Sequence, residues 1–135
     1  MSEIVVFDTS ILIADLRSGC HAKRMANCPG LIRNSSVVLA ELSRGTTTAA
    51  ERRFVRELAA SRPVLTPTEK NWLESGEVLA SVRAHTGFEP AKLRELHFDV
   101  LIALTARAHG ATLITSNRRD FELIRSYRNF KVEIW

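Results

Sequence analysis

Hydrophobic and polar positions alternate along this chain with two different periods. Short apolar runs rich in Val and Ile predict buried strands, and apolar residues that recur every three or four positions predict helices. The predicted strands are residues 2–8, 30–33, 64–65, 111–116 and 130–135. The predicted helices are residues 11–17, 37–45, 48–61, 66–85, 98–110 and 120–127. Strands and helices in this alternation predict an α/β fold with a mostly parallel central sheet, covered on both faces.

Turn and capping residues mark the boundaries between these segments. Thr9 and Ser10 are suited to cap the first helix. Gly87 and Pro90 indicate a connection ahead of the helix predicted at residues 98–110. The pattern therefore places the start of each helix directly after a polar or turn-forming segment.

The length of 135 residues and the lack of any repeat or linker predict a single domain over residues 1–135. No apolar run approaches the ~20 residues that a membrane helix needs. The start, MSEIVVFD, lacks the basic and long apolar regions of a signal peptide. The two cysteines, Cys20 and Cys28, are too few for a disulfide framework and lack the spacing of zinc ligands. We therefore expect a cytoplasmic protein without membrane association.

The charge of the chain leaves two interpretations open. The net charge is +4, and 15 of the 19 basic residues are Arg. The planar guanidinium group suits phosphate oxygens, so a nucleic-acid partner is one interpretation. A solvated, Arg-rich surface is the other.

Four acidic residues follow or interrupt apolar stretches. Asp8 comes after the first predicted strand, and Asp120 comes after the fourth. Glu41 and Asp99 belong to strongly apolar helical segments. In a parallel sheet the functional crevice lies beyond the carboxyl ends of the strands, so we expect Asp8 and residues 116–120 to share a site.

Each of these acids also has a purely structural explanation. Asp8, Asp99 and Asp120 could each cap a helix, and Glu41 could pair with Arg44 three residues later. If the four carboxylates converge instead, their repulsion raises their pKa values unless a cation offsets it. Because the set offers carboxylate oxygens and no Cys or His, that cation would be a hard divalent metal, Mg²⁺ or Mn²⁺.

Four segments together resemble one known family. The segments are FDTSILI, VLAELSRG, HFDVLIALTARAHGATLITSNRRDF and VEIW. In this order they are similar to the PIN-domain nucleases, above all to the VapC-type ribonuclease toxins of bacterial toxin–antitoxin pairs. The resemblance covers residues 4–135 and implies a three-layer α/β/α sandwich.

The resemblance also implies the site residues. It assigns the catalytic and metal-binding acids to Asp8, Glu41, Asp99 and Asp120. Many relatives carry an acid at the position of Asn117, so either Asn117 or Asp120 fills the fourth role. The substrate-binding residues that it implies are Ser10, Thr115, Asn117, Arg118 and Arg119.

The activity implied is that of a Mg²⁺-dependent endoribonuclease toxin, in which a metal-activated water hydrolyses RNA phosphodiester bonds. The implied partners are a structured RNA such as tRNA, a VapB-like antitoxin and a second copy of the chain. Without the four acids the net charge rises from +4 to +8, which favours a polyanionic substrate. The aromatic content of 7% predicts recognition of folded RNA by shape and phosphates rather than by base stacking.

Three other functions fit parts of the sequence. A phosphohydrolase related to the haloacid dehalogenases would use Asp8 as a nucleophile but usually has a second Asp where Ser10 stands. A receiver domain would need a Lys on the strand ATLITS, which has none. A catalytically silent PIN-like module that binds RNA or protein is the third, and Asn117 keeps it open.

Overall fold

Five parallel strands form the centre of the computed structural model, which describes residues 3–135. The strands are β1 (Ile4–Phe7), β2 (Leu31–Ser35), β3 (Val64–Leu65), β4 (Thr112–Thr115) and β5 (Lys131–Ile134). Their order across the sheet is β3-β2-β1-β4-β5, and all four neighbouring pairs run parallel. The predicted α/β class is confirmed, and the sheet is wholly rather than mostly parallel.

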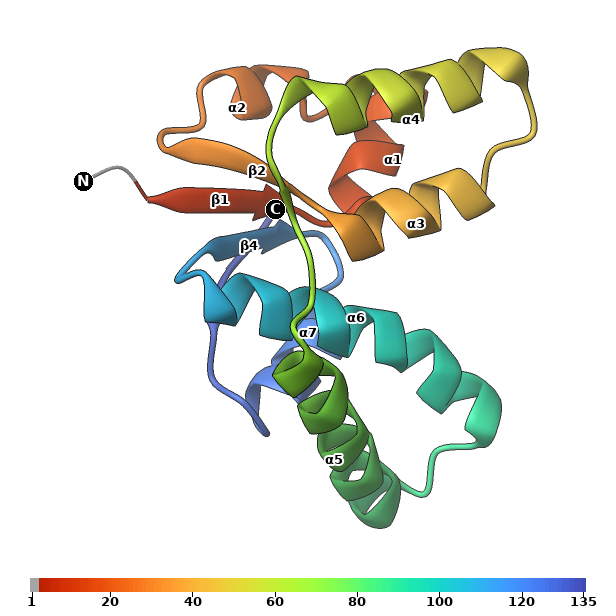
Figure 1. Ribbon diagram of the computed structural model, residues 1–135, viewed down its shortest axis with the longest axis vertical. Helices are drawn as coiled ribbons and strands as arrows, with labels where there is room; N and C mark the ends of the chain where they lie inside the picture. The colour runs from red at the N-terminus through yellow and green to blue at the C-terminus, as the bar shows by residue number, and fades with distance from the viewer. Residues whose placement is uncertain (1–2) are drawn as a thin grey trace.

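Helices cover both faces of this sheet. The helices are α1 (Thr9–Ser18), α2 (Ala22–Ala26), α3 (Ser36–Arg44), α4 (Ala49–Ser61), α5 (Glu69–Thr86), α6 (Pro90–Ala108) and α7 (Arg118–Arg125). Figure 1 shows α1 to α4 on one side of the strands and α5 to α7 on the other. The predicted three-layer α/β/α sandwich is therefore confirmed. Within residues 3–135 no helix combines the length and the apolar character needed to cross a membrane.

The order of the strands reverses direction between β1 and β4. The chain moves from β1 outward to β2 and β3, then crosses to β4 and moves outward to β5. The segments that follow β1 and β4 therefore leave the sheet toward opposite faces, as Figure 1 shows for α1 and α7. Such a switch point opens a crevice at the carboxyl ends of the strands.

The core lies on both sides of the two central strands. Val6 in β1 and Leu113 in β4 are buried, and α6 contributes a nearly continuous buried run from Val100 to Ala106. Because this helix packs against the sheet, Asp99, which directly precedes the buried run, is held in a fixed position relative to the strands.

Two predicted helix starts are wrong. Pro90 does not separate elements but occupies the first turn of α6, where a missing N–H costs nothing, so this helix begins eight residues before Phe98. Asp99 therefore lies in the helix interior and does not cap it. At the first helix, the residue in the cap position is Asp8 rather than Thr9 or Ser10. The short helix α2 was not predicted.

The turn before β2 places a glycine against the backbone of the N-terminal segment. Gly30 has φ +109°, and an added Cβ would clash with the carbonyl oxygen of Glu3. The neighbouring Leu31 N–H donates to that same oxygen at 2.7 Å, which sets the register of β1 and β2.

We predict that Gly30→Ala lowers the free energy of unfolding by about 2 kcal/mol or more, measured by urea denaturation. Gly76→Ala in α5 is the matched control, because its added Cβ meets no atom of the described chain within 4 Å. That exposed helical change should stabilise the protein by roughly 0.5–1 kcal/mol. Equal stability of Gly30→Ala and wild type would contradict the β1–β2 register.

Candidate functional site

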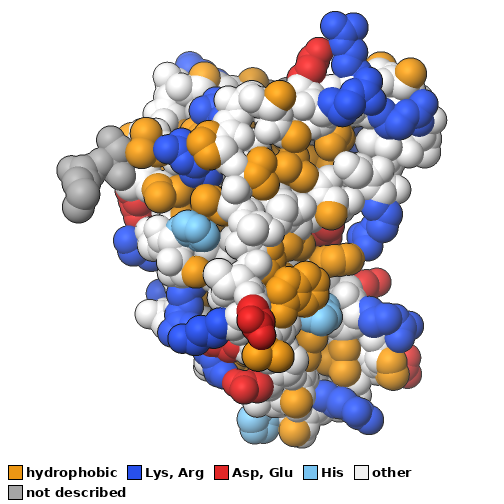
Figure 2. Space-filling view, in the orientation of Figure 1, with side chains coloured by type: hydrophobic (Ala, Val, Ile, Leu, Met, Phe, Trp, Pro, Cys, Tyr) orange, Lys and Arg blue, Asp and Glu red, His pale blue; other side chains and the backbone are white. Residues whose placement is uncertain are grey.

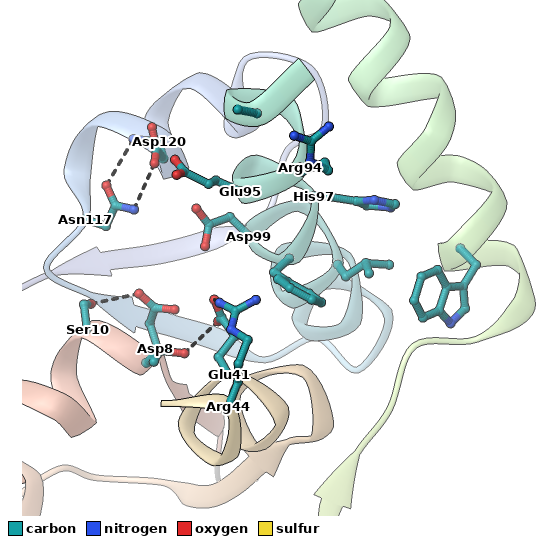
Figure 3. Close-up of a pocket in the computed structure, with 15 residues that line it drawn as sticks. Asp8, Ser10, Glu41, Arg44, Arg94, Glu95, His97, Asp99, Asn117 and Asp120 are labelled. Atoms are coloured by element: carbon teal, nitrogen blue, oxygen red, sulfur yellow. Dashed lines mark hydrogen bonds and ion pairs between the residues drawn. The ribbon is translucent and has the colours of Figure 1, made fainter. Parts of the chain in front are cut away.

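A cavity of about 920 Å³ lies at the carboxyl ends of the central strands. Its walls come from α1, α3, α5, α6 and the segment after β4, so residues far apart in the sequence face one space. Figure 3 shows Asp8, Glu41 and Asp99 pointing toward one another within it. The expected shared site at this edge of the sheet is present.

Three carboxylates converge in this cavity. Asp8 follows β1, Glu41 lies on α3, and Asp99 lies on α6. Each offers one oxygen atom, and these three oxygens lie within 4.8 Å of one another. Three negative charges at such distances repel one another strongly unless a proton or a cation intervenes.

Asp8 is held in place by two hydroxyl groups. Its side chain is only 3% exposed, and its Oδ2 accepts hydrogen bonds from Ser10 Oγ and Thr115 Oγ1, each at 2.8 Å. Its Oδ1 is buried without a hydrogen-bond partner among residues 3–135. Asp8 occupies the N-cap position of α1, but its carboxylate makes no capping hydrogen bond, so capping does not account for this buried charge. A buried, unpartnered carboxylate oxygen is costly and fits a metal ligand.

Glu41 is oriented into the cavity by a hydroxyl from α1. Thr9 Oγ1 donates to Glu41 Oε1 at 2.8 Å. Burial raises the pKa of Glu41, the Thr9 hydrogen bond opposes that shift, and the nearby charge of Asp8 adds to it. The predicted pair with Arg44 exists at 3.9 Å, but the Arg44 side chain is largely exposed, so this contact is weak.

Asp99 shows the effect of the crowded charges most clearly. Burial of its side chain raises the pKa of Asp99 to about 8, and the charges of Asp8, Glu41 and Asp120 add to the shift. Lys92 opposes it. Near neutral pH this carboxyl group therefore keeps its proton unless a cation takes the place of that proton.

Asp120 and Asn117 line the same cavity but lie outside the three-carboxylate cluster. Lys92 Nζ lies 3.1 Å from Asp120 Oδ1, and Asn117 Nδ2 donates to Asp120 Oδ2 at 3.2 Å. Asn117 caps α7 by accepting from the backbone N–H of Asp120. The structural explanation of Asp120 as a cap is therefore wrong, because Asn117 has that role.

The remaining predicted substrate-binding residues, Thr115, Arg118 and Arg119, are not positioned to contact a substrate in the cavity. Thr115 is 0% exposed, so it supports Asp8 and has no surface for a substrate. Arg118 pairs with Glu122 at 2.9 Å, and the described cavity lining contains neither Arg118 nor Arg119.

Two other arginines, Arg44 on α3 and Arg94 on α6, line the cavity in place of Arg118 and Arg119. Arg94 was missed because residues 90–97 were taken as a connection. Once α6 is known to begin at Pro90, Arg94 lies between one and two turns before Asp99 on the same helix.

The donor set fits a hard divalent cation. All three clustered ligand atoms are carboxylate oxygens, which is the ligand type that Mg²⁺ and Mn²⁺ prefer. The unpartnered Asp8 Oδ1 and the raised pKa of Asp99 both indicate negative charge without enough compensation. The residues therefore suit a hard divalent cation.

Comparison with known proteins identifies the family. The PIN domain matches residues 5–126, so the chain belongs to the PIN-domain family, as predicted. No curated protein sequence matches the chain.

Several solved structures share the fold over nearly the whole chain. VapBC-1 from nontypeable Haemophilus influenzae is 25% identical, covers 98% of both chains and has a TM-score of 0.71. DNA-bound VapBC from Salmonella typhimurium is 24% identical, covers 100% of this chain and 99% of its own, and also has a TM-score of 0.71. VapBC2 from Rickettsia felis, bound to a promoter DNA fragment, is 24% identical over 98% of both chains, with a TM-score of 0.70.

The raised pKa of Asp99 predicts how pH affects the metal-free protein. Between about pH 4 and pH 8 the native state keeps a proton that the unfolded chain has lost, so stability falls as the pH rises through this range. Asp99→Asn is neutral at every pH and avoids that loss. In EDTA, the variant should melt about 5 °C above wild type at pH 8 and close to it at pH 5. Parallel melting profiles for the two proteins would show that Asp99 is not a crowded carboxyl group.

Proposed function

We propose that this PIN-domain chain is a Mg²⁺-dependent endoribonuclease of the VapC toxin type, with residues 1–135 as one nuclease domain. The observation that carries the proposal is the convergence of Asp8, Glu41 and Asp99. The buried Oδ1 of Asp8 has no hydrogen-bond partner within the described residues 3–135, which supports it. Family membership supports nuclease chemistry, and the similar fold of the VapBC structures supports the toxin type. Mn²⁺ is the expected substitute metal.

In this proposal the three clustered carboxylates hold the cation. A bound divalent ion supplies an activated water and neutralises the charge that builds on the phosphate oxygens. Thr9, Ser10 and Thr115 fix the orientation of the carboxylates through their hydroxyl groups. Because every one of these groups belongs to a helix or to a strand end, the geometry is set before a substrate binds.

The fourth acidic role goes to Asp120 in this proposal. The side chain of Asn117 is already engaged with Asp120 at both its oxygen and its nitrogen, which leaves it a supporting role. Lys92 Nζ pairs with Asp120 at 3.1 Å, and Figure 3 shows Asp120 beside Asn117 at the cavity.

An RNA substrate fits the distribution of charge. Arg44 and Arg94 line the same cavity as the acidic cluster, and their guanidinium groups suit phosphate oxygens. The rest of the chain carries a net charge of +8 once the four acids are set aside, which attracts a polyanion toward the acidic cavity. This distribution supports RNA as the substrate.

A VapB-like antitoxin is the proposed partner. The similar structures are VapBC complexes, and an apolar groove between α1, α3 and α4 offers a docking surface. Ile13, Leu16 and Phe54 line this groove, which also reaches Glu41. A partner segment seated there would pass beside the carboxylates and block them. The homodimer implied by the family resemblance stays a prediction.

The catalytically silent module is the alternative that remains. Asn117, which stands where many relatives have an acid, favours it, and the tight Lys92–Asp120 pair removes charge from the same corner of the cavity. The phosphohydrolase and receiver alternatives do not suit a PIN-domain chain.

RNA cleavage separates these alternatives. We predict that the wild type shortens tRNA in the presence of Mg²⁺ or Mn²⁺ and that EDTA stops the reaction. Asp99→Asn should reduce the rate at least about 100-fold, because it removes one charge from the metal site. Asp15→Asn is the matched control, since Asp15 lies on α1 and is not among the described residues that line the cavity.

Two results would contradict different parts of this proposal. A near wild-type rate for Asp99→Asn would contradict the assigned site. A gel shift of the RNA without shortening, in the presence of either metal, would establish the silent module instead.

A further inference from the structure

The wall of the cavity beside the carboxylates is aromatic. Trp72 from α5 and His97 and Phe98 from α6 line it, and we call these three residues the aromatic wall. Trp72 is 51% exposed although it is one of the largest apolar side chains in the protein. On the face shown in Figure 2, hydrophobic side chains gather where α5 begins, beside a hollow in the surface. An exposed aromatic ring next to a charged cavity calls for an explanation.

Neighbouring groups hold Trp72 in a fixed position. The rings of Trp72 and His97 pack edge to face, with centroids 6.0 Å apart and an interplanar angle of 79°. His97 Nε2 lies 2.9 Å from Ser75 Oγ, and Ser75 Oγ donates to the backbone oxygen of Trp72 at 2.6 Å. Figure 3 shows His97 directed toward α5.

Positive charge accompanies the aromatic wall. The Arg44 guanidinium lies over the Phe98 ring at 5.1 Å, and Arg94 lines the same cavity. A cavity of about 920 Å³ is large enough for a nucleotide and its neighbours. One space therefore combines a stacking surface, phosphate-binding guanidinium groups and a cation site.

We propose that Trp72 stacks against an unpaired nucleobase adjacent to the phosphate held at the carboxylate cluster. The inference rests on the proposed nuclease function and adds a substrate-positioning residue to it: Trp72, which would hold one unpaired base beside the cleavage point. Bases inside a duplex are stacked on one another and offer no free face, so a helical segment cannot use this wall. The proposal differs on this point from the expectation of recognition by shape and phosphates, which stays a prediction.

The charge beside the wall favours RNA as its occupant. The Arg44 guanidinium lies over the Phe98 ring and Arg94 lines the same cavity, so the phosphate groups next to a stacked base would meet positive charge. Stacking on an aromatic ring is tolerant of sequence, so the wall selects for unpaired structure rather than for a particular base.

The test compares short unpaired and duplex oligoribonucleotides of equal length, with Asp99→Asn as the background so that the RNA is not cleaved. Adding Trp72→Ala should weaken binding of the unpaired RNA about tenfold and leave duplex binding unchanged. Trp72→Phe should lose less than threefold, because a smaller ring still stacks. Leu73→Ala is the matched control, since Leu73 is the next residue, is 68% exposed and is not among the described cavity-lining residues.

Fluorescence provides a second readout, because the chain contains only two tryptophans, Trp72 and Trp135. Unpaired RNA should quench the emission of the background protein and of its Trp135→Phe variant, but not that of its Trp72→Phe variant. Circular dichroism and melting confirm that each variant is folded.

The outcomes separate the inference from the function on which it rests. If the wild type cleaves RNA but Trp72→Ala binds unpaired RNA with unchanged affinity, the stacking inference is overturned and the nuclease function stands. If Trp72→Ala converts a dimer to a monomer without changing RNA affinity, the wall is a contact between copies and the inference is overturned. If RNA is neither bound nor cut by any form, both fail.

Discussion

Repulsion between carboxylates that cannot all remain charged is the constraint around which this structure is arranged. The clustered oxygens of Asp8, Glu41 and Asp99 lie within 4.8 Å of one another, and burial removes much of the water that would screen them. Burial raises the pKa of Asp99, and the charges of Asp8, Glu41 and Asp120 add to that shift. Among residues 3–135 the Oδ1 of Asp8 also has no hydrogen-bond partner. A hard cation resolves both at once, and the chemistry proposed for the protein follows from that need.

The fold supplies this crowding through its topology. The switch point between β1 and β4 opens the crevice, Asp8 enters it from the end of β1, and α3 and α6 bring Glu41 and Asp99 from opposite sides. Hydroxyl groups at the start of α1 and the end of β4 then fix the carboxylates. The aromatic wall, built where α5 packs against α6, gives the same cavity a surface for the non-reacting part of a substrate.

Much of this could be predicted from the sequence, because strand ends and apolar periodicity are local signals. The placement of Asp8 beside the segment after β4 followed from the parallel sheet, whereas the assignment of Glu41 and Asp99 to the same site came from the resemblance to the PIN-domain nucleases. The start of α6 could not be predicted in this way, because a proline such as Pro90 can mark either the end of one helix or the first turn of the next. Because of that error, Asp99 could be explained as a helix cap, and Arg94 was not recognised as a residue of the same helix. The exposure of Trp72 was also beyond the sequence, since the apolar period of α5 is equally typical of a core-facing helix.

The most direct test of the central claim is anomalous diffraction from a crystal grown with Mn²⁺. The account predicts an anomalous peak bonded to carboxylate oxygens of Asp8, Glu41 and Asp99, and its disappearance in crystals of Asp99→Asn. A well-ordered site that contains no peak between these three carboxylates, or a crystal in which they point to separate surfaces, would contradict it.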